Sequence, residues 1–276
     1  MPDHIFNKSE IDTSSLFSLK GKTALVTGGS RGIGLMIAQG YVEQGVKVYI
    51  SSRKADVCDA VAAELSELGE CVAVPADIST PEGCKGLADE MAKREDKLNI
   101  LVNNAGVSWG AEFDEFPDDA FKKVMGLNLH SIFSLTRDIV KLLEAAGTPQ
   151  DPARVINIGS MDGLHVNMVA GTGTFAYAAS KAAVHHLTRV LAVELAPRNI
   201  TSNAIAPGFF ESKMTEYLLD NRRDQIERNS PLKRIGKPEE MAGLAIYLAS
   251  RAGAYTNGTV IAVDGGTSVA YQRGAE

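Results

Sequence analysis

Residues 27–34 read Thr27-Gly28-Gly29-Ser30-Arg31-Gly32-Ile33-Gly34 and carry the strongest structural signal in the chain. They follow directly on the apolar run Lys22–Thr27 and lead into the helical pattern Gly34–Gln44. Glycines at these positions allow a tight turn, close approach of backbone N–H groups to a pyrophosphate, and close packing of helix on strand. The helix N-terminus adds free N–H donors that favour an anion. A glycine-rich turn between a strand and a helix therefore predicts a dinucleotide site.

Beyond this turn, short β-branched runs alternate with amphipathic stretches along the whole chain. The predicted strands are Lys22–Thr27, Val46–Ser51, Val72–Ala76, Ile100–Asn103, Arg154–Ile158, Thr201–Ala206 and Val260–Val263. The helical patterns include Gly34–Gln44, Asp119–Ala146, Ala176–Ala196 and Pro238–Ser250. Near-continuous apolar strands joined by helices predict an α/β fold: a single Rossmann-type, doubly wound domain with a seven-stranded parallel sheet and helices on both faces. We expect residues 1–20 to form an N-terminal arm, 21–276 the domain, and 209–235 a polar helical insertion on its substrate side.

Composition excludes several classes of function. The chain has 276 residues, 45% of them hydrophobic, and a formal charge of −6, which disfavours nucleic acid or an anionic membrane as a partner. No apolar run reaches the length of a membrane span, and the polar N-terminus is not a secretory signal, so we expect a cytoplasmic protein. The cysteines Cys58, Cys71 and Cys84 match no metal-binding or redox spacing, and we predict neither metal nor disulfide.

The end of the second predicted strand indicates which dinucleotide binds. NAD enzymes usually place Asp or Glu there to hold the ribose 2′-hydroxyl. This strand ends in Ser51-Ser52-Arg53-Lys54, without a carboxylate. Arg53 can bind a 2′-phosphate through charge-assisted hydrogen bonds, Arg31 is a second cation, and Ser52 can donate another bond. Solvated surface arginines are the alternative, but two at these positions favour NADP, the oxidised form of NADPH.

A second motif concerns acid–base chemistry. Tyr177 and Lys181 are four residues apart on a predicted helix, so their side chains share one face. A nearby cation favours the phenolate, so we expect Lys181 to lower the pKa of Tyr177. The Tyr-x-x-x-Lys spacing alone is common in helices. It indicates a catalytic pair only when the nucleotide loop and Ser160 are also present.

Taken in order, the motifs resemble the short-chain dehydrogenase/reductase family. The resemblance runs from about Lys20 to Gly266 through T-G-x-x-x-G-x-G, Asp77, Asn103-Asn104-Ala105-Gly106, Asn128, Ser160, Tyr177-x-x-x-Lys181 and Pro207-Gly208. It implies that Tyr177 exchanges a proton with the substrate oxygen, Ser160 hydrogen-bonds that oxygen, Lys181 holds the nicotinamide ribose, and Asn128 holds a relaying water. The implied NADP contacts are Gly28, Ser30, Arg31, Gly32, Ile33, Gly34, Ser52, Arg53, Asp77, Ile78, Asn104, Ala105, Gly106, Tyr177, Lys181, Pro207, Gly208 and Ser212.

Two other readings of the same residues differ in class. Ser160 follows a strand, as in hydrolases, but Ile158 occupies the first glycine position of the G-x-S-x-G elbow. His185 and His186 follow Lys181 on its helix, and we interpret them as helix-face residues rather than triad members. A non-catalytic NADP-binding sensor on this fold is the remaining alternative, and the intact set of Asn128, Ser160, Tyr177 and Lys181 weighs against it.

The substrate and the assembly are predicted by resemblance. The segments 105–110 and 207–215 are similar to those of the NADPH-dependent 3-oxoacyl reductases of the rhamnolipid type, which implies reduction of a 3-oxoacyl thioester or similar ketone. Sugar-alcohol or steroid dehydrogenase activity stays open. Ser160 and Tyr177 enclose a longer segment than is usual in the family, so we hypothesise that residues 161–176 and 209–228 wall an apolar pocket with His165, Phe209 and Phe210 as substrate contacts. Excess apolar residues on Asp119–Ala146 and Ala176–Ala196 predict a homotetramer, or else a dimer.

Overall fold

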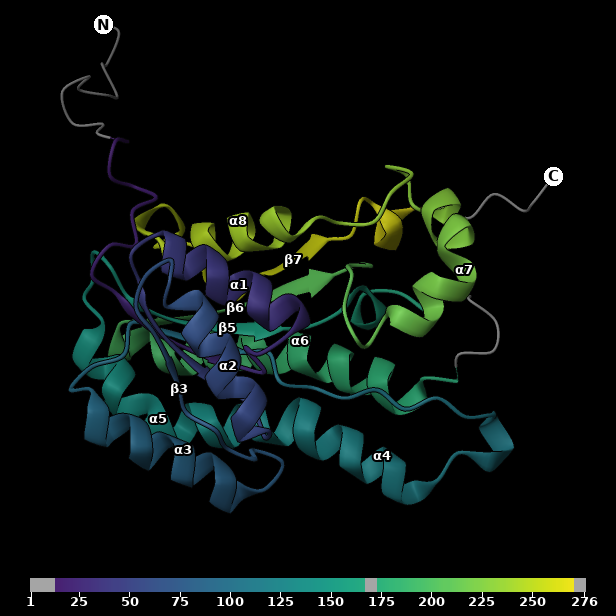
Figure 1. Cartoon of the computed structure of the whole chain (residues 1–276), viewed down its shortest axis with the longest axis horizontal. Coiled ribbons are helices and arrows are strands. Elements are labelled where there is room, and N and C mark those ends of the chain that lie inside the picture. Colours follow the sequence, from purple (N-terminus) through teal and green to yellow (C-terminus); the bar gives the residue numbers. More distant parts are fainter. Residues whose placement is uncertain (1–12, 167–172, 271–276) are drawn as a thin grey trace, which may run out of the picture.

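The computed structural model describes residues 13–166 and 173–270, and its centre is a seven-stranded sheet (Figure 1). All strand pairs are parallel, in the order β3-β2-β1-β4-β5-β6-β7. The strands are β1 (Thr23–Thr27), β2 (Lys47–Ser51), β3 (Cys71–Ala73), β4 (Ile100–Asn103), β5 (Ala153–Ile158), β6 (Ile200–Pro207) and β7 (Val260–Val263). The predicted fold class is confirmed.

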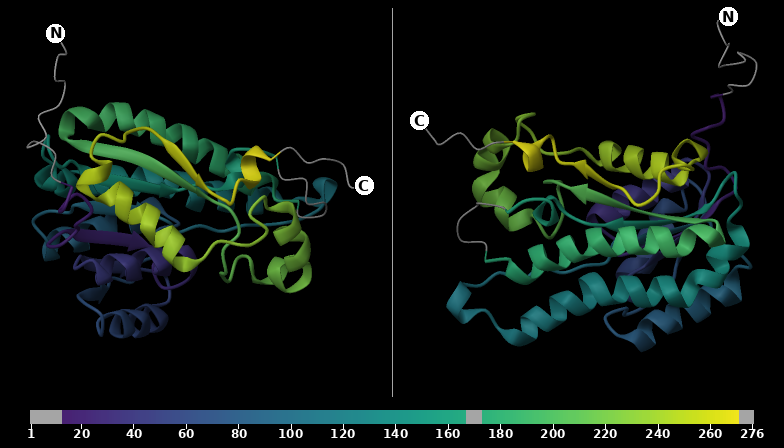
Figure 2. Two further views of the ribbon diagram at one scale, coloured as in Figure 1. Left: turned by 90° about the horizontal axis from the view of Figure 1, so that it is seen from above. Right: turned by 180° about the vertical axis from the view of Figure 1, so that it is seen from behind.

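Helices cover both faces of the sheet, each over its own apolar core. On one face lie α1 (Gly32–Glu43), α2 (Ala55–Leu65) and α8 (Pro238–Ala249), and on the other α3 (Pro81–Arg94), α5 (Ser131–Ala146) and α6 (Phe175–Leu195) (Figure 2). The sheet supplies alternating residues to the two cores: Ala24 and Val26 of β1 point to one, and Leu25 to the other. This alternation is the expected consequence of a strand that is buried on both faces.

The carboxyl ends of the strands meet at one edge of the sheet, and the helix α7 (Glu216–Asn229) lies beyond that edge (Figure 1). The chain reverses its direction of winding between β1 and β4, which are neighbours in the sheet although β2 and β3 come between them in sequence. Ligands of doubly wound sheets bind in the crevice at such a switch point. The fold therefore places the glycine-rich turn after β1 beside the segments that follow β4, β5 and β6.

Three elements differ from the sequence-based expectation. β3 ends at Ala73 rather than Ala76, although the N–H groups of Val74 and Ala76 still donate to the carbonyls of Ile50 and Ser52. The helix expected over Asp119–Ala146 consists of α4 (Asp118–Met125), a π-helical turn Gly126–His130, and α5. In the expected arm, Leu19 is completely buried in the core, so the described end of this segment is part of the domain packing.

The amino ends of the strands meet at the opposite edge, where charged groups are buried. Arg154, which is 1% exposed, donates from Nε to the carbonyl of Leu248 and from Nη2 to Asp151 and the carbonyl of Ser250. Lys22 donates to Asp151 and to the carbonyl of Ala249. Two cations thus bind the last carbonyls of α8, where the helix dipole favours positive charge.

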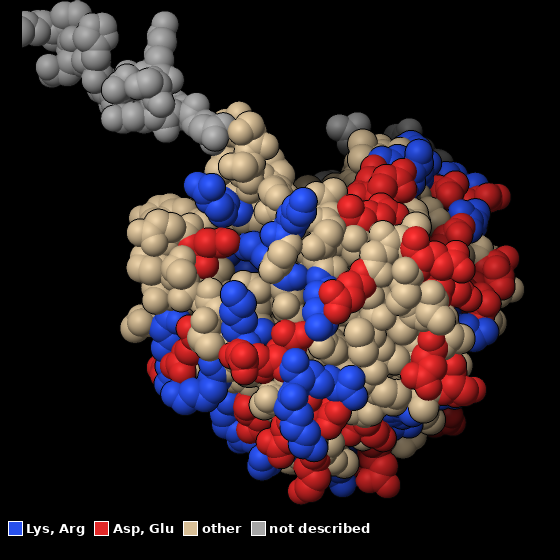
Figure 3. Space-filling view, turned by 60° about the vertical axis from the view of Figure 1, so that its left-hand side comes forward, with Lys and Arg blue, Asp and Glu red and all other residues tan. Residues whose placement is uncertain are grey.

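On the outer surface, the face viewed in Figure 3 carries acidic and basic side chains interspersed. Within residues 13–166 and 173–270, no helix is long and apolar enough to cross a membrane.

Candidate active site

The turn after β1 has a shape that only glycine fits at two positions. Gly28 has φ of +66°, and a Cβ there would lie 2.7 Å from the Nδ2 of Asn104. A Cβ on Gly34 would lie 2.3 Å from the carbonyl oxygen of Gly28. The turn is therefore a close-packed cradle whose backbone faces the start of α1, which is the geometry that a pyrophosphate requires.

The glycine turn is fastened to the segment after β4 through Thr27. Its Oγ1 accepts hydrogen bonds from the backbone N–H of Asn104 (3.0 Å) and of Ala105 (3.1 Å). The side chain of Asn104 donates in return to the carbonyls of Thr27 (2.9 Å) and Gly28 (3.2 Å). Asn104 is one of the expected NADP contacts, and in the structure its side-chain amide holds the turn in shape.

The corner expected to take a 2′-phosphate holds exposed basic side chains. Arg31 begins α1 and Arg53 follows β2; neither guanidinium makes an ion pair with any described residue. Asp77 lies near Arg53, and its pKa is lowered mainly by a hydrogen bond from Ser79, with a smaller contribution from Arg53. Ile78, the neighbouring expected contact, is buried. Two unpaired guanidinium groups at this corner suit a doubly charged phosphate.

The segment after β6 closes over the same turn. Pro207 ends β6, and a Cβ on Gly208 would lie 2.7 Å from the Cα of Asp264, so this backbone packs closely on the segment after β7. A Cβ on Gly32 would lie 3.0 Å from the Cβ of Ser212. Ser212 thus covers the glycine turn, as expected of a residue on the nicotinamide side.

Among the predicted catalytic residues, Lys181 is buried, with 5% of its surface exposed. It lies one helical turn after Tyr177 on α6, and its Nζ is 5.5 Å from the centre of the Tyr177 ring. Nζ donates a 2.7 Å hydrogen bond to the carbonyl of Ile158, at the end of β5. Burial lowers the pKa of Lys181 to about 8. The ammonium is therefore mostly charged at neutral pH.

Tyr177 departs from the expected acidity. Burial raises the pKa of its phenol to about 12; a hydrogen bond with Ser160 lowers it, and the charge of Asp162 raises it. The sequence-based expectation that Lys181 lowers this pKa is wrong, because burial penalises the phenolate more strongly. At neutral pH Tyr177 is a phenol, which is the form that can give a proton to a carbonyl oxygen.

Asn128 lies at the π-helical turn between α4 and α5 and is completely buried. Its Oδ1 accepts from the backbone N–H of Val107 (2.8 Å), and its Nδ2 donates to the carbonyl of Val107 (2.9 Å) and to the Oγ of Ser180 (3.1 Å). The amide of Asn128 thus joins the segment after β4 to the catalytic helix. Single-turn π-bulges frequently mark functional sites.

His185 contacts the turn that carries Ser160, and the sequence-based reading did not predict this contact. It is 3% exposed, with its ring directly behind the turn that carries Ser160, whereas His186 is exposed as expected. Both histidines lie on faces of α6, and the face that carries His185 is buried. The spacing of these residues indicates a shared position, because residues 177, 181 and 185 are each four apart and therefore lie on one face of α6.

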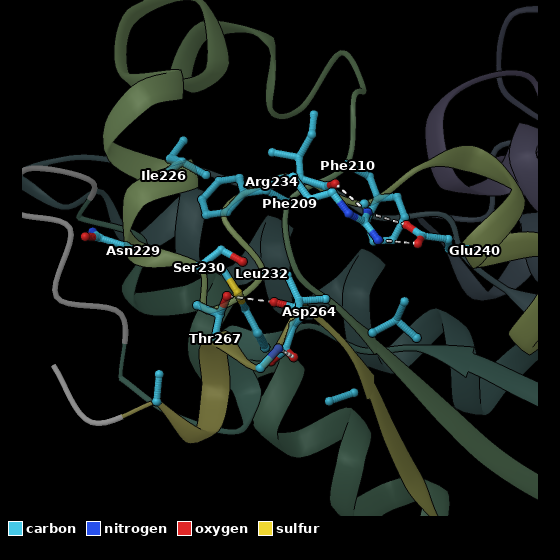
Figure 4. Close-up of a pocket in the computed structure, with 18 of the residues that line it drawn as sticks. Phe209, Phe210, Ile226, Asn229, Ser230, Leu232, Arg234, Glu240, Asp264 and Thr267 are labelled. Atoms are coloured by element: carbon cyan, nitrogen blue, oxygen red, sulfur yellow. Dashed lines mark hydrogen bonds and ion pairs between the residues drawn. The ribbon is translucent and has the colours of Figure 1, made fainter.

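A cavity of about 490 Å³ lies beside this turn, under α7 (Figure 4). Phe209, Ile226, Leu232 and Val263 form apolar walls, and the turn contributes Met161 and His165. Phe210 also borders it, but its ring is buried against Gly236 and belongs to the core of the α1–α8 face. The Arg234 guanidinium at the cavity is held by both oxygens of Glu240. All three expected substrate contacts, His165, Phe209 and Phe210, thus line one cavity.

The long segment between Ser160 and Tyr177 is described only at its ends. Residues 167–172, with Met168, Val169 and Gly171 on which the pocket-wall hypothesis partly depends, lie outside the described residues. Before them, Val166 is 81% exposed. After them, Gly173 has φ of +51°, and its carbonyl accepts from the N–H of Ala111.

Comparison with known proteins agrees with this geometry. A family model described as enoyl-(acyl carrier protein) reductase matches residues 28–268. A rhamnolipids biosynthesis 3-oxoacyl-[acyl-carrier-protein] reductase of Pseudomonas aeruginosa is 49% identical over 91% of this chain and 97% of its own. A 5-keto-D-gluconate 5-reductase of Escherichia coli is 33% identical over 93% of this chain and 99% of its own.

Two solved structures are similar throughout their length. One is described as a Pseudomonas aeruginosa RhlG/NADP active-site complex, with a TM-score of 0.88 and 47% identity, covering 92% of this chain and 98% of that one. The other is a gluconate 5-dehydrogenase of Burkholderia cenocepacia in complex with NADP and tartrate, with a TM-score of 0.85 and 32% identity, covering 93% and 99%.

Proposed function

This chain belongs to the short-chain dehydrogenase/reductase family, and from that premise we propose that it reduces the 3-keto group of a 3-oxoacyl thioester with NADPH. The observation that carries the proposal is the position of an apolar cavity beside Ser160. Met161 and His165 belong to the same turn as Ser160 and also line the cavity. An acyl chain in the cavity would bring its thioester and keto group toward the hydroxyls of Ser160 and Tyr177.

The cofactor suits the residues present, because the glycine turn leads from β1 into the N-terminus of α1 and because Arg31 and Arg53 lack ion-pair partners among the described residues. When bound, NADPH supplies the hydride that goes to the keto carbon. The resemblance to the family's motif assigns Lys181 to the nicotinamide ribose. The relatives reported with NADP, and the absence of a carboxylate in Ser52-Arg53-Lys54, support NADP over NAD.

The chain's own residues then handle the proton. Ser160 donates a hydrogen bond to the keto oxygen and polarises the carbonyl, and Tyr177 gives its phenolic proton to that oxygen as the new C–H bond forms. The product is a secondary alcohol, and the phenolate that remains is stabilised by the Lys181 ammonium 5.5 Å from the ring centre. Asn128, joined to α6 through Ser180, is the residue beside which we expect the relay: Lys181 passes a proton on to the Tyr177 phenolate, and the relay returns one to Lys181.

The decisive experiment is a steady-state screen of the purified protein with NADPH. It compares 3-oxoacyl thioesters of short and long chain with simple ketones, 5-ketogluconate, a sugar and a steroid ketone. We expect kcat/KM to be highest for the acyl thioesters and to rise with chain length as apolar area is buried in the cavity. Higher kcat/KM for 5-ketogluconate would favour the sugar-acid activity named for two relatives, and no turnover of any carbonyl would favour an NADP-binding sensor.

Specific polar groups at the cavity disfavour a sugar acid as the main substrate. A carboxylate ligand would need a free cation, whereas both terminal nitrogens of Arg234 are engaged by Glu240. The remaining lining is more apolar than polar: it includes Met161, Phe209, Leu232 and Val263, beside the polar residues Asn229, Ser230, Asp264 and Thr267. An acyl chain fits such a lining better than a polyhydroxy chain does.

We further propose that the protein works as a homotetramer in the cytoplasm, with a dimer as the alternative assembly. Apolar side chains are exposed on the outer faces of α5 and α6: Phe133 is 43% exposed, Val190 51% and Val193 78%. These helices lie side by side over the sheet, so their exposed residues offer an apolar surface to a second copy. The free thiols of Cys58, Cys71 and Cys84 suit a reducing compartment.

A further inference from the structure

The imidazole of His185 occupies a socket formed by the turn after β5. A Cβ on Gly159 would lie 2.1 Å from the Nε2 of His185, and a Cβ on Gly163 would lie 2.7 Å from its Cε1. The two glycines therefore flank Ser160 and also make room for the ring. Any side chain at Gly159 would have to displace the imidazole, since Cβ atoms do not approach other atoms this closely.

Both ring nitrogens of His185 bind the backbone of this turn. The N–H of Ser160 donates to Nε2 at 3.4 Å, and Nδ1 lies 3.3 Å from the carbonyl oxygen of Gly163. Since an N–H can only donate and a carbonyl only accept, the ring must be neutral with its proton on Nδ1. Both hydrogen bonds are long, so the fit of the ring in its socket contributes to the restraint as well.

The surroundings keep the ring in this form. Burial lowers the pKa of His185, the hydrogen bond to Gly163 raises it and the charges of Lys181 and Arg189 lower it, which together bring it to about 4. His185 is thus neutral over the working pH range, and the proton transfers of the reaction do not use it. His185 lies eight residues after Tyr177 and four after Lys181 on α6. The same helix therefore carries the acid Tyr177, the cation Lys181 and the histidine that contacts the Ser160 turn.

We propose that His185 is a positioning residue, which holds the backbone of residues 160–163 so that the Ser160 hydroxyl stays directed at Tyr177 and the substrate oxygen. The Oγ of Ser160 already accepts from the N–H of Asp162 at 3.1 Å, so the direction of its own proton depends on the shape of the turn. The same turn places Met161 and His165 at the cavity. The inference deepens the proposed function and rests on the assignment of Ser160 as a group that binds the substrate oxygen.

The first test compares His185→Leu, which keeps apolar bulk but has no hydrogen-bonding atom, with His185→Gln, whose amide can still accept from Ser160 and donate to Gly163. His186→Leu is the matched control, because His186 is the adjacent, exposed residue of the same helix. We expect the Leu variant to lose about 100-fold in kcat with unchanged NADPH affinity, since small misplacements of catalytic groups cost rates of this order. The Gln variant should recover most of the loss, and His186→Leu should behave as wild type.

The comparison distinguishes positioning from packing. A purely structural role predicts that His185→Leu retains kcat or that both His185 variants lose NADPH binding and thermal stability together; either result would overturn the proposal. Equal loss of kcat in the Leu and Gln variants would overturn it as well. The substrate is whichever carbonyl compound the wild type turns over best, so failure of the 3-oxoacyl assignment leaves this test intact.

The second test is a double-mutant cycle on the socket, which decides the question even if His185→Leu does not fold. Gly159→Ala should reduce kcat strongly, because its methyl group displaces the imidazole. In the background of His185→Ala, the nearest remaining atom is the carbonyl oxygen of Ile205 at 3.2 Å, so Gly159→Ala should cost little more. Additive effects of the two substitutions would show that the ring and the glycine act separately, and would contradict the proposal.

Discussion

The phenol of Tyr177 and the ammonium of Lys181 share one face of α6 and respond to burial in opposite directions. Burial raises the pKa of the phenol to about 12 and lowers the pKa of the ammonium to about 8. Both shifts favour the neutral form of each group. Consequently Lys181 is the first of the two to lose its proton as the pH rises, and the acid Tyr177 is still protonated when it does.

This order of titration predicts the pH dependence of carbonyl reduction. The value of kcat/KM should be level through neutral pH and fall as the pH rises through about 8, where Lys181 loses the charge that holds the ribose and stabilises the phenolate. Lys181→Met has no proton to lose there, so its low rate should be level over the same range. A wild-type profile that stays level well beyond this pH would exclude Lys181 as the controlling group.

Removing the phenolic hydroxyl tests the acid directly. Tyr177→Phe should bind NADPH with wild-type affinity and lose about 100- to 10,000-fold in kcat, which is the usual contribution of general acid–base catalysis. Tyr255→Phe is the control, because Tyr255 is fully exposed. Fluorescence titration with NADPH and single-turnover rates give the two quantities separately. Substantial turnover by the Tyr177 variant would assign the proton to another group.

The choice of cofactor is tested at Arg53. Arg53→Asp should lower kcat/KM with NADPH by at least about tenfold, since one charge-assisted hydrogen bond contributes about 1.5–3 kcal/mol. The value with NADH should hold or improve, because a carboxylate can bind the ribose 2′-hydroxyl. Lys97→Asp makes a similar change of charge at an exposed position before β4. If wild-type protein used NADH and NADPH equally well, the assignment of Arg53 would fail.

Among single residues, those with a motif could be found from sequence and those defined by burial could not. Tyr177, Lys181 and Ser160 carry a recognisable spacing, and the structure brings them together. The direction of the Tyr177 pKa depends on how much solvent the fold removes, which no spacing records. His185 faces a turn distant in sequence, and the contact arises only after β5 and α6 pack together.

The packing of α8 on the strands depends on a buried cluster at the amino edge of the sheet. Lys22, Asp151 and Arg154 form two ion pairs there, with side-chain exposures of 11%, 30% and 1%. The single carboxylate of Asp151 compensates both cations, and Nη1 of Arg154 has no hydrogen-bond partner among the described residues. Loss of this carboxylate would leave two largely buried positive charges next to each other.

We therefore predict that Asp151→Asn lowers the free energy of unfolding by about 2 kcal/mol, a value reduced from that of a fully buried pair because Asp151 is partly exposed. Asp89→Asn removes an exposed pair with Lys85 on α3 and should cost less than about 0.5 kcal/mol. Urea unfolding at one fixed protein concentration measures both. Since this edge is opposite the active site, kcat should stay near wild type in both variants; equal stability of the two would show that the cluster contributes nothing.

The positions of helices and strands were largely predictable, because apolar residues recur in the sequence at the spacing of each element. The residues at which the elements end were less predictable. β3 is shorter than expected, although Val74 and Ala76 beyond its end still donate hydrogen bonds to β2 and the loop after it. The π-helical turn Gly126–His130 cannot be read from periodicity, because the residues on either side keep a helical pattern. It is the packing of Asn128 against Val107 and Ser180 that accompanies the change of helix type.

For the whole molecule, the exposed faces of α5 and α6 predict association. Light scattering at micromolar concentration should give the mass of four chains, and Val193→Glu should reduce it, since a buried unpaired charge opposes an apolar interface. Val57→Glu, at a position of α2 that is 39% exposed, should leave the mass unchanged. A monomeric wild type would contradict both the tetramer and the dimer.

The helix α7 has a consequence for how this enzyme could acquire new substrates. Of its 14 residues, all within the described chain, Leu219 and Ile226 are the buried ones. On either side, Phe210 and Gly236 form an isolated bridge that closes the segment at its base. Because this segment has few buried residues and closes at its base, relatives could exchange residues 213–235 while keeping the nucleotide turn, Ser212 and the proton-transfer residues unchanged. Changes of substrate range among relatives would then be concentrated in this segment, because substitutions there would destabilise the rest of the fold little.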